Sequence, residues 1–167
     1  ERYLQLPDSL PERVGRLAVE GIGDNEIPYL AAFRIELYLR RNYAFDLKVD
    51  DQPPLRDPVD FFLFESQEGY FDHHASAMAV MLRTVGIPAR IAVGFVLDDS
   101  TFDEETRTFI LSEADSWAWP QVYFPGFGWV DFNPTPMRGV VSRPGSDGLS
   151  IGGSNSGASG SGEDLLD

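Results

Sequence analysis

The residues best suited to chemistry lie together in the middle of the sequence. Asp72, His73 and His74 are consecutive, and Ser76 follows them. An imidazole beside a carboxylate and a hydroxyl could act as a general base for hydrolysis or acyl transfer. Ser116 is a second hydroxyl, but neither serine lies in a nucleophile-elbow pattern. A hydrolase or acyl-transfer enzyme that uses Asp72, His73 and Ser116 is therefore the alternative hypothesis.

The same segment is a poor candidate for a metal site. Consecutive residues on a helix point about 100° apart, so His73 and His74 cannot easily share one ion. A cluster of carboxylates offers oxygens further along, but it lacks the alternation and the glycine of a calcium-binding loop. That cluster comprises Asp98, Asp99, Asp103, Glu104 and Glu105. A solvated hairpin tip explains it better, and we expect no metal ion and no cofactor.

Composition excludes several classes of function. The chain of 167 residues has no cysteine, which rules out disulfides and thiolate nucleophiles. Its net charge of −14 would repel phosphate, so nucleic acid and anionic lipid headgroups are poor partners. No apolar run approaches the roughly 18 residues of a membrane span, and no signal peptide is visible.

The most aromatic stretch follows residue 118. It contains Trp119, Tyr123, Phe124, Phe127 and Trp129. Alternation along strands sends about half of such side chains into the core, and the others could contact a peptide or a glycan. The turn at residues 125–128 would present Phe127 outward. The candidate binding residues are Asp72, His73, Trp119 and Phe127.

The elements that must position these residues change in type along the chain. Helical patterns cover residues 11–20, 28–42, 57–65 and 72–85. The last is apolar nearly all round, which predicts a buried central helix with Asp72 as its N-cap. Strand patterns cover residues 91–97, 107–111, 119–124 and 129–132. Helices followed by antiparallel strands predict an α+β domain.

The end of the sequence differs in composition. Residues 144–162 are mostly glycine and serine, which is typical of a flexible linker. We therefore predict a folded domain over residues 1–141 and a flexible linker or tail over residues 142–167. We also expect the chain to be a fragment of a longer protein.

Three stretches carry a recognisable pattern. Residues 69–83 run into Gly-Ile-Pro-Ala-Arg at 86–90, residues 115–123 read Asp-Ser-Trp-Ala-Trp-Pro-Gln-Val-Tyr, and residues 128–136 end in Asn-Pro-Thr-Pro. Together they resemble the bacterial transglutaminase-like superfamily, in the form found as extracytoplasmic domains of multi-pass membrane proteins. The resemblance covers roughly residues 10–138. It implies a papain-like core in which a central helix packs on an antiparallel sheet.

The resemblance also implies a catalytic triad that this chain has lost. The family's cysteine, histidine and aspartate positions fall on Phe71, Trp117 and Asn133. A phenyl ring cannot attack a carbonyl and an indole cannot accept a proton. We expect Phe71 to be largely buried against Trp117, filling the former cleft. The alternative is an open aromatic groove that binds a ligand.

These observations favour a pseudoenzyme, a catalytically inactive module for binding, scaffolding or regulation. By resemblance it belongs to a larger membrane protein, on the extracytoplasmic side of a bacterial membrane. An unidentified protein or peptide is the expected partner. Contact with the membrane is expected only through other segments of the parent protein.

Overall fold

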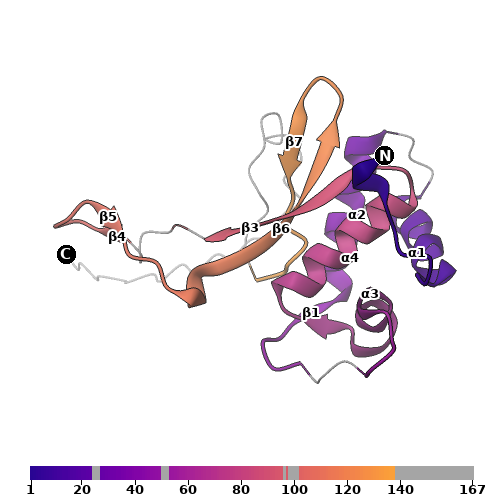
Figure 1. Ribbon diagram of the computed structural model, residues 1–167, viewed down its shortest axis with the longest axis horizontal. Coiled ribbons are helices and arrows are strands. Elements are labelled where there is room, and N and C mark those ends of the chain that lie inside the picture. Colours follow the sequence, from indigo (N-terminus) through magenta and orange to yellow (C-terminus); the bar gives the residue numbers. More distant parts are fainter. Residues whose placement is uncertain (24–26, 50–52, 96, 98–101, 138–167) are drawn as a thin grey trace, which may run out of the picture.

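A computed structural model describes residues 1–137 except 24–26, 50–52, 96 and 98–101. Four helices come first and the main sheet follows (Figure 1). The helical elements are η1 (Arg2–Leu4), α1 (Glu12–Ile22), α2 (Pro28–Asn42), α3 (Pro58–Phe61), η2 (Phe62–Ser66), α4 (Phe71–Thr84) and η4 (Glu113–Asp115). The strands are β1 (Ala44–Phe45), β2 (Glu68–Gly69), β3 (Ala89–Phe95), β4 (Phe102–Asp103), β5 (Thr108–Phe109), β6 (Ser116–Phe124) and β7 (Gly128–Asp131).

Helix α4 is the buried central helix that its composition predicted. It packs against α1, α2 and α3 on one side and against β3 and β6 on the other. Met78, Met81 and Leu82 are among its fully buried side chains. The predicted N-cap was wrong, because Tyr70 caps the helix and Asp72 lies in its first turn. A carboxylate there still interacts favourably with the helix dipole.

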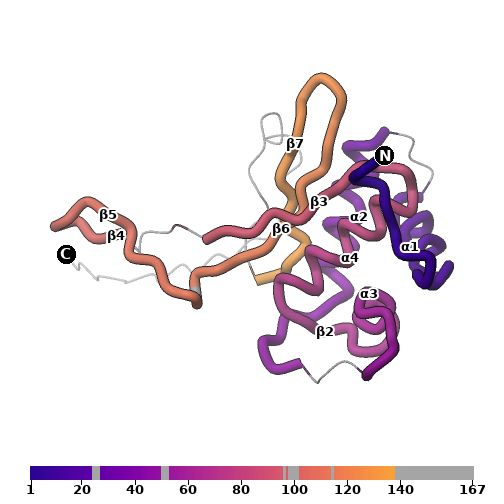
Figure 2. Tube along the Cα trace, in the orientation of Figure 1, coloured from indigo at the N-terminus to yellow at the C-terminus, as the bar shows by residue number. Residues whose placement is uncertain are grey.

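The main sheet is antiparallel, with strand order β3-β6-β7. Ala89 pairs with Val122 at one end of the β3–β6 ladder, and Phe95 pairs with Ser116 at the other. Helices on one face of an antiparallel sheet confirm the predicted α+β class. The strand expected at 107–111 is confirmed only over Thr108–Phe109. Only β5 forms there, and it pairs with β4 in a separate hairpin at the end of a projecting arm (Figure 2).

Polar contacts cap α3 and join it to α1. Asp57 caps α3 by accepting hydrogen bonds from the backbone of Val59 and Asp60, each at 3.0 Å. The helix predicted over 57–65 is α-helical only to Phe61 and continues as a π turn. Arg13 of α1 donates two hydrogen bonds of 2.5 Å to Asp60, which joins the first helix to α3.

The chain that follows β7 is held against α2. Glu36 is fully buried and accepts a hydrogen bond of 2.6 Å from the backbone of Asn133. Arg40 donates to the carbonyls of Asn133 at 2.9 Å and Thr135 at 2.5 Å. One turn of α2 therefore fixes the end of the described chain.

Two predictions concern residues that the structure does not describe. The domain end at 141 and the linker over 142–167 lie beyond residue 137, and Asp98 and Asp99 fall in the gap at 98–101. Within the described part of the chain, none of the helices is long and apolar enough to cross a membrane.

Candidate functional site

Two aromatic rings meet at the start of α4. Phe71 is the first residue of the helix, and Trp117 is the second residue of β6. Their ring centroids are 4.8 Å apart, with 36° between the planes. The expected contact between the two residues is confirmed.

Further rings extend this contact into an aromatic row that consists of Phe45, Trp117, Phe71 and Tyr70. The Phe45 ring stacks on Trp117 with centroids 6.4 Å apart, and Tyr70 meets Phe71 edge-on at 5.6 Å. Trp117 is only 9% exposed. Phe71 is partly buried, so the expectation that it would be largely buried was too strong. Its place in the first helical turn, with no preceding turn to cover it, explains the exposure.

Asn133 lies beside the strand that carries Trp117. The backbone of Phe132 donates to the carbonyl of Pro120 at 3.0 Å, so the chain continues alongside β6 beyond the end of β7. Asn133 is 5% exposed, and its side-chain oxygen accepts a hydrogen bond from the backbone of Thr135 at 3.2 Å. That bond closes a local turn, a common use of asparagine.

His73 lies between rings rather than between catalytic partners. Its imidazole is 4.4 Å from Tyr70 and 5.7 Å from Phe62, measured between ring centroids. The Nδ1 atom is buried and has no hydrogen-bond partner within the described part of the chain. Burial lowers the pKa of His73, and the nearby Asp72 opposes that shift.

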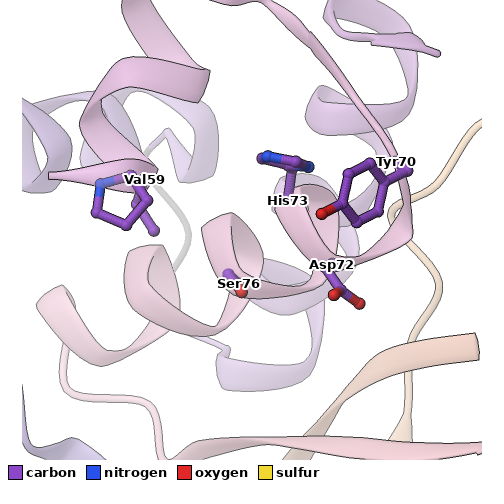
Figure 3. A pocket seen from close by; sticks show the side chains of 6 residues that line it. Val59, Tyr70, Asp72, His73 and Ser76 are labelled. Carbon is purple, nitrogen blue, oxygen red and sulfur yellow. The ribbon is translucent and has the colours of Figure 1, made fainter. Parts of the chain in front are cut away.

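A small cavity adjoins His73 (Figure 3). Its volume is about 180 Å³. The lining residues are Pro58, Val59, Tyr70, Asp72, His73 and Ser76. The carboxylate of Asp72 points away from the imidazole of His73 (Figure 3). The structure therefore gathers three of the residues singled out in the sequence, without arranging them as an acid–base relay.

Ser116 does not join this group. Its hydroxyl donates to the backbone carbonyl of Glu113 at 2.6 Å, at the start of β6. No hydrogen bond joins His73 to Asp72, Ser76 or Ser116 in the described part of the chain. The described residues contain no group of three or more histidine, cysteine, aspartate or glutamate side chains that could hold a metal ion.

His74 belongs to the core. It is fully buried, and its Nδ1 lies 3.1 Å from the carbonyl of Tyr70. Its Nε2 is buried and forms no hydrogen bond with any residue that the structure describes. Burial lowers the pKa of this imidazole, so the neutral form is favoured in the folded state.

The two aromatic candidates beyond the aromatic row differ in environment. The indole of Trp119 donates to Asp131 at 2.9 Å on the sheet face opposite the helices. Phe127 is 87% exposed at the β6–β7 turn, which confirms that the turn presents it outward. Beside it lies an apolar cavity of about 630 Å³, lined by Ile27, Pro28, Tyr29, Phe124, Pro125, Phe127 and Val130. No sequence pattern predicted this cavity, because its two walls lie about a hundred residues apart.

Comparison with known proteins identifies the family. The Transglutaminase-like superfamily matches residues 16–134. This chain belongs to that superfamily. The protein YebA of Bacillus subtilis, described as uncharacterized, is 39% identical over 140 residues, covering 81% of this chain and 19% of YebA. A protein-glutamine gamma-glutamyltransferase of Pseudomonas aeruginosa is 33% identical over 137 residues, covering 80% of this chain and 20% of that enzyme.

Solved structures support the same fold. The periplasmic domain of TgpA from P. aeruginosa, bound to ethylmercury, matches with a TM-score of 0.70 and 30% identity. The match covers 80% of this transglutaminase-like chain and 47% of that domain. A putative cysteine protease from Cytophaga hutchinsonii, at 19% identity and a TM-score of 0.57, agrees in fold alone. The chain spans about a fifth of the length of its curated relatives.

Proposed function

We propose that this chain is a catalytically inactive transglutaminase-like domain that serves as a binding, scaffolding or regulatory module. The observation that carries the proposal is the absence of cysteine from the whole sequence. The helix start that would favour a thiolate instead begins with Phe71. No other side chain in the chain can supply a thiol.

The assignment of the lost triad adds to this argument. If Phe71, Trp117 and Asn133 occupy the family's three positions, each has lost its chemical role. The ring contact of 4.8 Å between Phe71 and Trp117 supports the first two assignments, because a nucleophile and its base must lie side by side. An asparagine can orient an imidazole, but at this site no imidazole remains to be oriented.

The setting of the domain follows from its relatives. One is a periplasmic domain and another is a protein-glutamine gamma-glutamyltransferase, and both are much longer than this chain. We infer that this domain lies on the extracytoplasmic side of a bacterial membrane within a larger membrane protein. A protein or peptide is its proposed partner.

An activity assay tests the loss of catalysis. The purified chain should neither incorporate amines into glutamine-containing protein nor hydrolyse amides, with or without divalent metal ions. The Pseudomonas gamma-glutamyltransferase, assayed in parallel, provides the positive control. Turnover that survives purification and disappears in His73→Gln or Ser116→Ala would replace this proposal with the alternative enzyme. Turnover unaffected by either change would indicate a contaminant.

A further inference from the structure

Strand β3 exposes a row of large apolar side chains. Ile91 is 43% exposed, Val93 77% and Phe95 54%, and alternation places all three on one face. The opposite face of β3 carries the ring of Trp119, since a Cβ added to Gly94 would lie 3.0 Å from that ring. Isolated exposed apolar residues are ordinary, but three in register on one strand form a patch.

The backbone of the same residues faces outward. The N–H of Tyr123 donates to the carbonyl of Pro88 at 3.0 Å, which fixes the hydrogen-bonding parity of the β3–β6 ladder. In an antiparallel pair only alternate residues bond the partner strand. Even-numbered residues of β3 therefore bond β6, while Ile91, Val93 and Phe95 direct their N–H and C=O groups away from it.

A contact at the beginning of the strand verifies this parity. The guanidinium of Arg83 donates to the carbonyl of Ala89 at 3.0 and 2.8 Å, so that odd-numbered carbonyl does point outward. Beyond Ala89, no hydrogen bond occupies the outward groups of Ile91, Val93 or Phe95 within the described chain. We call these three residues, with their outward backbone groups, the β3 edge.

The β3 edge lacks the features that usually prevent strand pairing. Natural edge strands carry inward-pointing charges, lysine, proline or a bulge. The single charged residue of β3 is Arg90, and its guanidinium lies 4.1 Å over the ring of Trp129, on the face opposite Ile91, Val93 and Phe95. The β3 edge is therefore a ready template for an additional strand.

We propose that the β3 edge accepts an extended, basic strand of a partner protein, which adds to the sheet beside β3. This inference names a surface and a partner class for the proposed binding role, and it rests on that role. Alternate apolar side chains of the partner would cover Ile91, Val93 and Phe95, while its backbone would complete the ladder.

Charge favours a basic partner over a second copy of the chain. The net charge of −14 makes two copies repel each other. Phe95 pairs with Ser116, which directly follows Glu113 and Asp115 of η4. Lysine or arginine at that end of the partner strand would therefore be attracted to the site.

A synthetic peptide tests the proposal on the full 167-residue chain. The probe is acetyl-Lys-Val-Lys-Val-Thr-Val-Lys-amide with a fluorescent label, titrated by fluorescence polarisation. We expect saturable binding that weakens with added salt. N-methylation of alternate amides or Val93→Lys should weaken it roughly tenfold or more. Val19→Lys, at a similarly exposed position on α1, is the matched control and should leave binding unchanged.

Amide hydrogen exchange locates the bound strand. The amides of Ile91 and Val93 should exchange freely in the chain alone and become protected by the peptide. Absence of saturable binding, or binding unaffected by Val93→Lys, overturns the proposal. Protection of these amides in the free chain would also overturn it in two cases. If the protection is lost on dilution, a second copy of the chain occupies the β3 edge. If it is lost on deletion of residues 138–167, the chain's own end occupies the β3 edge. None of these outcomes measures catalytic turnover, so the activity assay tests the inactive-domain proposal independently.

Discussion

His74 should make the stability of this domain sensitive to mild acid. Its side chain is fully buried, and its Nε2 is in hydrogen-bonding geometry with none of the described residues. Burial is the main cause that lowers its pKa, and the charges of His73 and Arg40 act in the same direction. The backbone carbonyls of Tyr70 and Tyr43 oppose the shift without cancelling it. A proton that binds the unfolded chain is therefore disfavoured in the folded one.

The sign and size of the effect follow from proton linkage. An unfolded histidine titrates near pH ~6.5, so below that pH the unfolded state binds more protons and the free energy of unfolding decreases. The loss continues until the pH reaches the lowered pKa of the folded state. If His74 stays neutral when folded, the loss at pH 5.5 is about 1.4 kcal/mol relative to neutral pH. The pKa of His73 is lowered as well, but His73 is only partly buried, so it contributes less to the loss of stability.

Urea unfolding at pH 7.5 and pH 5.5 measures this loss. Both values lie above the carboxylate range, and the Arg13 guanidinium holds the pKa of Asp60 below its usual value, so acidic groups contribute little. His74→Leu, of similar volume, should remove most of the pH dependence, whereas His73→Gln should keep most of it. An equal loss in the parent chain and in His74→Leu would refute the reasoning, because folded His74 would then take up its proton as readily as unfolded His74.

Three further outcomes are expected. Phe71→Ala should lower the free energy of unfolding by about 2 kcal/mol in urea titrations. That is less than the roughly 3–5 kcal/mol that truncation of a fully buried phenylalanine costs. A decrease below ~1 kcal/mol would contradict this and show that the ring contributes little packing. Arg13→Ala should lower the Tm more than Arg16→Ala. The first change leaves Asp60, which is 4% exposed, without its Arg13 partner, whereas Arg16 pairs with an exposed glutamate. Equal decreases in Tm would contradict this. Deleting residues 144–167 should leave the Tm unchanged by calorimetry, since glycine and serine bury little apolar surface; a clear decrease would indicate that the segment docks.

The central helix and the fold class were predictable from the sequence because their signal is local. An apolar pattern nearly all round a helix has one physical explanation, burial on every side, and α4 shows it. The Phe71–Trp117 contact was predictable only from the resemblance, since no periodicity links residues that far apart. Partial exposure of Phe71 depends on what precedes the helix, which sequence patterns do not report.

The errors have equally physical causes. The segment 107–111 contains residues with high β propensity. That propensity mostly reflects how well a side chain packs on a pleated, half-buried surface, and the projecting hairpin of β4 and β5 provides little such surface. Asp72 has the residue type of an N-cap, yet the helix begins with the aromatic residue before it. The cavity beside Phe127 joins the start of α2 to the β6–β7 turn, and only tertiary structure brings these together.

The two proposed features relate to the stability of the fold in opposite ways. On the proposed loss of the triad, the rings of Phe71 and Trp117 add apolar burial at the start of α4 in place of polar groups that active sites keep at a cost in stability. The β3 edge shows the reverse, since a single lysine at Val93 would protect it from unwanted pairing without disturbing the core. Under both proposals, the domain is organised for binding along β3 rather than for chemistry at Phe71.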